Sequence, residues 1–208
     1  MNVTAKIPEP INRRSLLKAG AGLAAAVSLT LSLAACSVED PLAQQANAGD
    51  NKNYIAGDGS VTEYAPGQRG EPVKLAAKLF DGTAVDSADW AGKVTVLNFW
   101  YAACAPCRLE APDLQALSQE YKGQAQFFGV NIRDEVRTAE AFERNFGITY
   151  PSFADKNGNI LLAMTSYVPP QAVPTTLVLD KQGRVSARIL GVADKGTLKT
   201  LIKDAVAE

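Results

Sequence analysis

Histidine is absent from this chain of 208 residues. Its absence excludes Ser-His-Asp triads, Cys-His dyads and most zinc sites, because each of these depends on an imidazole. Methionine occurs only twice, which argues against a soft-metal site for copper(I). An excess of positive charge is also missing, since 21 basic side chains face 22 acidic ones. This balance argues against nucleic-acid binding, which needs clustered basic residues.

Cysteine is scarce, but its three positions are informative. Cys36 stands alone, whereas Cys104 and Cys107 form a Cys-x-x-Cys pair. A zinc site would need about four ligands, and the chain has no histidine to supply them. A static cross-link over so short a loop would stabilise the fold little. The pair therefore predicts redox chemistry that uses no metal and no cofactor.

Residues 1–35 predict a signal peptide for export. Arg13, Arg14 and Lys18 provide its positive charge, and an apolar run without acidic residues follows at 19–31. This run is shorter than the roughly 20 residues that a transmembrane helix needs. The paired arginines resemble a twin-arginine signal, although ordinary Sec signals also contain such pairs.

The sequence Leu-Ala-Ala-Cys36 ends this segment and resembles a bacterial lipobox. The resemblance implies cleavage before Cys36 and attachment of diacylglycerol to its thiol. Two acyl chains hold a protein stably at a bilayer, so the expected location is the extracytoplasmic face of the cell membrane. The alternatives for Cys36 are a buried core cysteine or a third redox thiol.

Composition divides the remaining chain into a tether and a domain. Residues 36–71 are rich in alanine, asparagine, glycine and other small or polar residues, which predicts a flexible tether after the lipidated cysteine. A short edge strand at 54–55 or at 61–64 is the alternative for part of it. Residues 72–208 predict a single folded domain.

The domain alternates between strand and helix patterns. Strands are expected at residues 73–80, 94–100, 126–132, 175–179 and 185–190. Helices are expected at residues 105–121, 138–146 and 196–206, with Thr138 as an N-cap and Gly147 as a helix stop. The Asp-Lys-Gln-Gly sequence at 180–183 predicts a hairpin between the last two strands. This order predicts an α/β fold with helices on both faces of a central sheet.

The Cys-x-x-Cys pair lies where a buried strand ends and a helix begins. Unpaired amide groups and the positive end of the helix dipole favour a thiolate at Cys104. Cys107 follows one turn later, and Pro106 is tolerated in a first helical turn. We therefore expect Cys104 to be the exposed attacking thiolate and Cys107 the more buried resolving thiol.

Two segments resemble one known family. The sequence Asn-Phe-Trp-Tyr-Ala-Ala-Cys-Ala-Pro-Cys-Arg-Leu-Glu-Ala-Pro-Asp-Leu at 98–114 resembles the active site of TlpA/ResA-like thioredoxins. These are membrane-tethered proteins, many of which serve cytochrome c maturation. The sequence Val-Pro-Thr-Thr-Leu-Val-Leu-Asp at 173–180 resembles the cis-proline segment of the same fold. The resemblance implies a thioredoxin-like fold, in which helices flank both faces of a central mixed β-sheet.

The resemblance also implies roles for individual residues. Pro174 would be cis and lie against the disulfide, and the backbone of Val173 would pair with an extended segment of a partner. Glu110 would be an acid–base or partner-contact residue, with an ordinary solvated helix glutamate as the alternative. The family usually has tryptophan where this chain has Ala103, and the smaller side chain leaves less surface for contact with a partner. Trp100 is a candidate to supply that contact surface, with a core residue as the alternative.

These observations predict an extracytoplasmic thiol–disulfide oxidoreductase that exchanges a Cys104–Cys107 disulfide with exported proteins. The family resemblance implies a reductant in cytochrome c maturation, with apocytochrome c as a substrate and a membrane electron donor of the CcdA/DsbD type. The alternatives are a DsbE/DsbF-like disulfide-forming oxidase, a peroxiredoxin-like thiol peroxidase and a copper(I)-binding lipoprotein.

Overall fold

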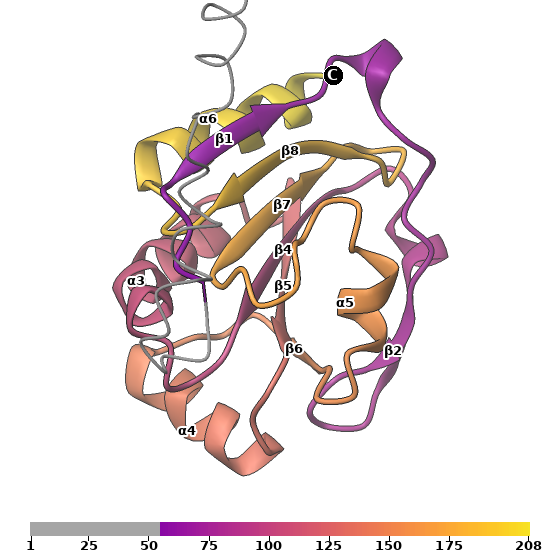
Figure 1. The fold of residues 1–208 in the computed structure, drawn as a ribbon. Helices are drawn as coiled ribbons and strands as arrows, with labels where there is room; N and C mark the ends of the chain where they lie inside the picture. Colours follow the sequence, from indigo (N-terminus) through magenta and orange to yellow (C-terminus); the bar gives the residue numbers. More distant parts are fainter. Residues whose placement is uncertain (1–54) are drawn as a thin grey trace, which may run out of the picture. The chain divides into compact units, whose positions relative to one another are not determined.

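A six-stranded mixed sheet is the centre of the structure, a computed structural model that describes residues 55–208 (Figure 1). The strand order is β1-β8-β7-β4-β5-β6. The strands are β1 (Ser60–Glu63), β4 (Val94–Trp100), β5 (Ala125–Asn131), β6 (Ser152–Ala154), β7 (Thr175–Leu179) and β8 (Val185–Leu190). Strand β5 runs parallel to β4 and β6, and the other neighbours pair antiparallel. The predicted mixed sheet is thus confirmed.

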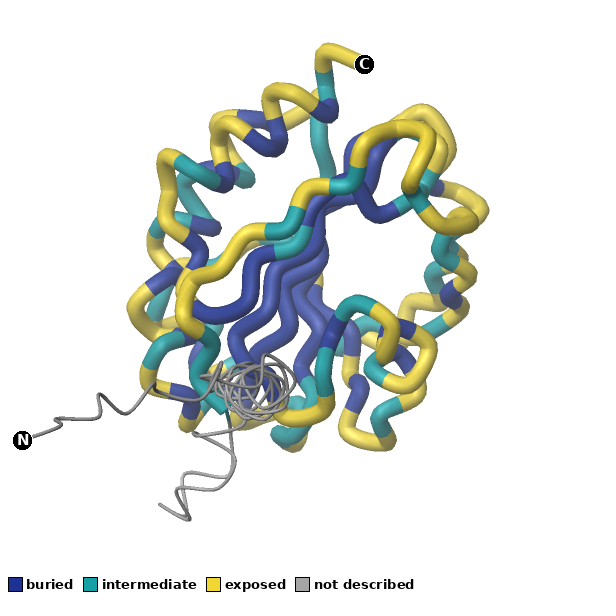
Figure 2. Tube along the Cα trace, turned by 45° about the horizontal axis from the view of Figure 1, so that its top comes forward, coloured by how far each residue is buried: buried dark blue, intermediate teal, exposed yellow. Residues whose placement is uncertain are grey.

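Helices cover both faces of this sheet. They are α3 (Ala105–Glu120), α4 (Val136–Phe146), α5 (Asn159–Ala163) and α6 (Lys195–Ala207). Every residue of β4 is buried, because side chains from each of its faces meet a different apolar cluster. Val94 and Val96 pack with residues of α3 and α6, whereas Leu97 and Phe99 pack with Ile160 of α5. Figure 2 shows the buried sheet between helices whose outer faces are exposed.

Several predicted elements agree with the structure in their bounds. Strands β4, β7 and β8 begin and end at the predicted residues, and α3 begins at Ala105 as expected. Gly147 adopts the left-handed conformation (φ 64°) and ends α4, as predicted. Within residues 55–208, no helix is both long enough and apolar enough to cross a bilayer.

The predicted N-cap of α4 is wrong. The helix starts at Val136 with Glu135 as its cap, so Thr138 lies inside the first turn. The reason is a turn directly after β5. The side-chain oxygen of Asn131 accepts hydrogen bonds from the amides of Arg133 (3.1 Å) and Asp134 (2.8 Å), which starts the helix earlier.

The predicted strand at residues 73–80 is also wrong in extent. Only β2 (Ala76–Lys78) is extended there, and it pairs with β3 (Ala84–Asp86) in a separate two-stranded sheet. Asp81 and Gly82 form the intervening turn, in which Gly82 has a φ of 85°. The sequence analysis did not predict β3, α5 or the 3₁₀ turns η1 (Pro66–Gln68) and η2 (Ser87–Trp90). These elements are short, so local patterns identify them poorly.

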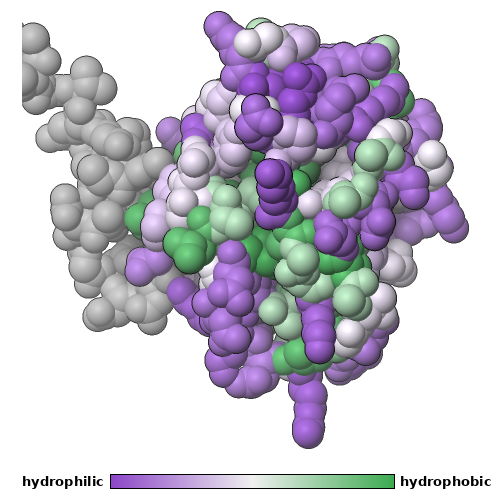
Figure 3. Space-filling view, turned by 90° about the vertical axis from the view of Figure 1, so that its right-hand side faces the viewer, coloured by the Kyte–Doolittle hydropathy of each residue, from purple (hydrophilic) through white to green (hydrophobic). Residues whose placement is uncertain are grey.

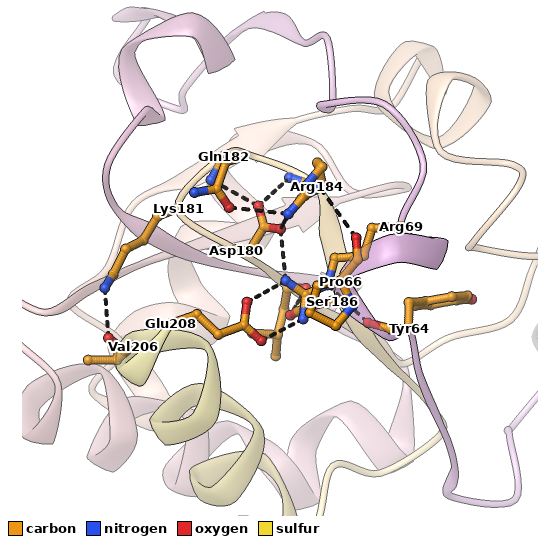
Figure 4. Close-up of polar contacts among 11 residues, drawn as sticks. Tyr64, Pro66, Arg69, Asp180, Lys181, Gln182, Arg184, Ser186, Val206 and Glu208 are labelled. Carbon is orange, nitrogen blue, oxygen red and sulfur yellow. Dashed lines mark hydrogen bonds and ion pairs between the residues drawn. The ribbon is translucent and has the colours of Figure 1, made fainter.

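The folded domain begins before the predicted boundary at residue 71. Strand β1, inside the predicted tether, pairs antiparallel with β8, which agrees with the alternative of an edge strand at 61–64. Figure 4 shows Arg69 between Asp180 and Glu208. Its guanidinium contacts the buried Asp180 carboxylate at 2.9 Å and Glu208 at 2.7 Å. Long-range contacts therefore fix residues whose composition alone predicted a tether. Cys36 and the predicted signal lie outside the described residues.

Candidate active site

Cys104 and Cys107 form a disulfide at the start of α3, directly after the buried strand β4 (Figure 1). Their Cα atoms lie 5.3 Å apart. Cys104 is the N-cap of the helix, and its Sγ accepts a hydrogen bond from the amide of Cys107 at 3.2 Å. Pro106 lies in the first turn, where no amide hydrogen is needed. The helix N-terminus is therefore positioned to stabilise a thiolate at Cys104.

Both cysteines are buried in the disulfide form. The exposed fraction is 0% for Cys104 and 2% for Cys107, so the expected exposure of Cys104 is wrong for this state. The reason is the segment before Pro174, which packs on the disulfide. The carbonyl oxygen of Val173 lies 3.9 Å from Sγ of Cys104, and Val173 belongs to the same apolar cluster as both cysteines. A partner can reach Cys104 only after some of this cover moves.

The Val173–Pro174 peptide bond is cis, as the family resemblance implies. Pro174 is buried, and its carbonyl oxygen accepts a hydrogen bond from the amide of Gly191 at 2.9 Å. The fold thereby brings together two sequence segments almost 70 residues apart, with Val173 beside Cys104. This is the arrangement that the two separate motifs predict.

Glu110 lies inside the protein with an exposed fraction of 1%, so the alternative of a solvated helix glutamate is wrong. Its Oε1 accepts a hydrogen bond from Nδ2 of Asn98 (2.7 Å), and its Oε2 accepts one from the amide of Ala193 (2.8 Å). Burial raises the pKa of Glu110 to about 8, and the two hydrogen bonds oppose this rise only in part. Glu110 is thus a carboxyl group that holds its proton at neutral pH.

A small cavity lies behind the disulfide. It has a volume of about 10 Å³ and is lined by Cys107, Asn98, Tyr150 and Ser152 among others. This volume is at the lower limit of what one water molecule needs. The buried Oγ of Ser152 has no hydrogen-bond partner. Asn98 lines this cavity together with Cys107 and also donates a hydrogen bond to Glu110, so it lies between Cys107 and the buried carboxyl group.

Trp100 contributes core rather than partner surface. Its side chain is 4% exposed and packs against Phe142 of α4 at a tilt, with ring centroids 4.5 Å apart. Gly129 makes room for it, because a Cβ at that position would lie 2.6 Å from the indole nitrogen. The exposed apolar residue on α3 is instead Leu109, at 72%.

Several residues at this site carry no signal in the sequence that assigns them to it. Ala193 contacts Glu110 through a backbone amide, which no side-chain pattern can reveal. Tyr150 and Ser152 line the cavity from the segment around β6, which resembles a strand entry of the same family, but the sequence assigned them no role at the site. Burial raises the pKa of Tyr150 far above its usual value.

A wider hollow lies elsewhere on the domain. Its lining comes from residues 72–76, 86–88, 91 and 182–183, and it shares no residue with the cavity behind Cys107. Figure 3 shows the side of the domain that carries β2, where a band of hydrophobic side chains runs between hydrophilic ones. Among residues 55–208, no cluster of acidic and cysteine side chains is arranged to hold a metal ion.

Comparisons with known proteins agree with this geometry. The Redoxin family model matches residues 65–204, and the model of the twin-arginine translocation pathway signal matches residues 10–30. The second match shows that the chain carries an export signal. The crystal structure of a secreted thiol-disulfide isomerase from Corynebacterium glutamicum superposes with a TM-score of 0.68 at 30% identity, covering 73% of this chain and 95% of that one. The thioredoxin-like fold is therefore confirmed.

Proteins of similar sequence are named as thiol–disulfide oxidoreductases or interchange proteins. Thiol-disulfide oxidoreductase ResA of Geobacillus kaustophilus is 36% identical over 109 residues, which are 52% of this chain and 60% of that protein. Thiol:disulfide interchange protein HelX of Rhodobacter capsulatus is 35% identical over 127 residues, 61% of this chain and 66% of the relative. The similarity thus spans less than two thirds of each relative's length.

Proposed function

This chain belongs to the redoxin family, and on that premise we propose that it is an extracytoplasmic thiol–disulfide oxidoreductase acting on exported proteins. The observation that carries the proposal is the Cys104–Cys107 disulfide at a helix N-terminus, with the cis Val173–Pro174 segment beside it. A disulfide closing a two-residue gap contributes little to stability, whereas it is well suited to opening and closing. The names of the relatives ResA and HelX agree with this chemistry.

The proposed exchange has two steps. In the reduced protein, the Cys104 thiolate attacks one sulfur of a partner disulfide, and the other partner sulfur leaves as a thiolate. The Cys107 thiolate then attacks Sγ of Cys104, which releases the second partner sulfur and forms the internal disulfide. Two electrons pass to the partner, whose disulfide becomes a dithiol. The backbone of Val173 holds an extended segment of the partner during these steps.

Glu110 is the proposed acid–base group for Cys107. The thiol must lose its proton before the second step, and a free cysteine has a pKa of about 8.5. In its ionised form, a carboxyl group with a pKa of about 8 can accept that proton at little energetic cost. Asn98 positions the carboxyl group through its 2.7 Å hydrogen bond and also lines the cavity that Cys107 reaches.

The proposed direction is reduction of the partner. Strong disulfide-forming catalysts owe their oxidising power to a strongly stabilised thiolate. In this chain no histidine is present, and in the disulfide form a single amide donates a hydrogen bond to Sγ of Cys104. This modest stabilisation favours a reductant. Cytochrome c maturation, with apocytochrome c as the partner and a CcdA/DsbD-type membrane donor of electrons, is the proposed setting.

The proposed location is the outer face of the cell membrane, with a lipid on Cys36. The matched export signal at residues 10–30 ends shortly before the Leu-Ala-Ala-Cys36 sequence. Cys36→Ser is expected to move the exported protein from the membrane fraction to the soluble fraction. Mass spectrometry of the unsubstituted protein should find diacylglycerol on Cys36, and an unmodified thiol there would contradict the anchor.

The proposed activity is tested by reduction of insulin with dithiothreitol as the electron source. We expect micromolar amounts of the full chain to speed precipitation of the insulin B chain, because Cys104 exchanges faster than dithiothreitol alone. A Cys104→Ser variant is the control. If the two proteins and dithiothreitol alone give the same rate, the proposed function is wrong.

A further inference from the structure

The backbone edge beside the disulfide is already paired within the chain. The amide of Ile55 donates to the carbonyl oxygen of Gln171 at 2.8 Å, and the amide of Val173 donates to the carbonyl oxygen of Ile55 at 3.2 Å. Together these bonds form a parallel β-bridge between Ile55 and Ala172. Under the proposed function, Val173 supplies the backbone with which a partner pairs. The chain's own residue 55 therefore occupies that position.

Two glycines allow the chain to lie this close. A Cβ at Gly57 would lie 2.3 Å from the carbonyl carbon of Leu190, and one at Gly191 would lie 2.7 Å from that of Gly57. Real Cβ atoms do not approach backbone atoms at such distances, so each position requires glycine for close backbone contact. The amide of Gly59 adds a hydrogen bond to the carbonyl oxygen of Leu190 at 2.7 Å.

The close contact between Gly57 and Gly191 involves the same loop that supports the cis-proline segment. The amide of Gly191 donates to the carbonyl oxygen of Pro174 at 2.9 Å, so one face of this glycine supports Pro174 and another faces Gly57. Residue 60 then begins β1, which is fixed on β8. Residues 55–59 thus run from a fixed strand to the edge of the redox site.

We propose that residues 55–59 form an internal strap that covers the pairing edge at 171–173 and is displaced by the extended segment of a protein partner. This inference rests on the proposed function, because it names how the same site is regulated. The strap and the partner compete for the Val173 amide, which can donate to only one of them. An extended polypeptide satisfies that amide when the strap leaves, whereas a small disulfide without a peptide backbone does not.

The strap is bound weakly enough to be displaced. Two hydrogen bonds join Ile55 to the edge, and the net contribution of each such bond to stability is small. Residues 55–57 are only half-buried, and residues 58–59 are exposed. Local opening of such segments needs much less free energy than global unfolding.

Gly57→Ala tests the strap, and Gly67→Ala is its matched control. An alanine Cβ at position 57 meets the backbone of Leu190, whereas one at position 67 meets nothing within 4 Å. In the full-length chain, we expect the Val173 amide to exchange hydrogen faster in Gly57→Ala than in the control. The rate of insulin reduction should rise about fivefold, the effect of removing roughly one hydrogen bond. Reduction of bis(2-hydroxyethyl) disulfide should change less than about twofold.

Ile55→Pro provides a second variant, because proline lacks the amide that donates to Gln171. A similar rise in the rate of insulin reduction in Gly57→Ala and Ile55→Pro supports the strap. If the Val173 amide of the unsubstituted protein exchanges hydrogen as fast as an unprotected amide, the strap proposal is wrong. The proposal is also wrong if the amide exchanges faster in the variants but insulin reduction is no faster. If no variant reduces insulin, the proposed function fails on its own. Hydrogen exchange then still decides whether residue 55 protects the amide.

Discussion

Cys107→Ser is expected to accumulate a stable mixed disulfide between Cys104 and its protein partners. Serine cannot attack Sγ of Cys104, so the second step of exchange stops after the first has taken place. Cys104→Ser should trap no partner, because the N-capping thiolate that makes the attack is gone. Each variant should lose more than about 1,000-fold in insulin reduction, as is typical when a nucleophile is removed.

The roles of the cysteines can be separated by non-reducing electrophoresis of membrane extracts. The double variant Cys104→Ser/Cys107→Ser is the control for disulfides that form elsewhere. Partners that accumulate on Cys104→Ser, and not on Cys107→Ser, would show that the roles are reversed. The burial of both sulfurs in the disulfide form makes this test necessary, since exposure does not distinguish them.

Glu110→Gln is expected to remove a large pH dependence of stability. The carboxyl group titrates near pH 4.5 when unfolded and near pH 8 when folded, so the folded state binds more protons between these values. Its contribution is therefore fully present below pH 4.5 and is lost as the pH rises through about 8. Within this window the free energy of unfolding of the oxidised protein should fall by about 1 kcal/mol per pH unit.

Urea unfolding at several pH values measures this effect. The slope should be much smaller in Glu110→Gln, since glutamine does not titrate. Glu120→Gln on the same helix is the control, because Glu120 lies at the exposed end of α3 and pairs only with the exposed Lys199. Equal slopes in the unsubstituted protein and in Glu110→Gln would show that Glu110 does not hold a proton in the folded state.

The same substitution should slow the release of partners. Because the pKa of Glu110 is about 8, only about a tenth of it is ionised and able to act as a base at pH 7. Its loss should therefore slow the second step by about tenfold at this pH, less than the roughly 100-fold expected of a fully ionised base. Stopped-flow measurement of mixed-disulfide decay separates this step from the first one. A change confined to the first step would contradict the proposed role and indicate that Glu110 contacts the partner instead.

The local sequence predicted those parts of the site whose structure depends on residues close by in the chain. The apolar run at 94–100 specified β4, and its end placed Cys104 at the cap of α3. The second motif predicted the cis bond before Pro174 through family resemblance, not through physical reasoning alone. The start of α3 follows from its own segment, whereas the cis-proline segment is also held by the hydrogen bond from Gly191.

Contacts between distant segments could not be predicted in this way. The environment of Glu110 depends on the backbone amide of Ala193, 83 residues later. A short edge strand at 54–55 is one alternative for the predicted tether, but the pairing of Ile55 with Gln171 and Val173 could not be predicted, because that loop has no strand pattern. Composition likewise predicted a tether at residue 69, where a buried ion pair with Asp180 instead fixes the chain.

The reduction potential of the Cys104–Cys107 couple tests the central claim most directly. The full-length protein would be equilibrated with dithiothreitol and glutathione buffers, and its thiols counted after alkylation. We predict a value near that of thioredoxin, roughly −270 mV, because the Cys104 thiolate is only modestly stabilised. A value near roughly −120 mV would contradict the proposed reductant and indicate a disulfide-forming catalyst. A pair that does not cycle at all would contradict the redox function itself.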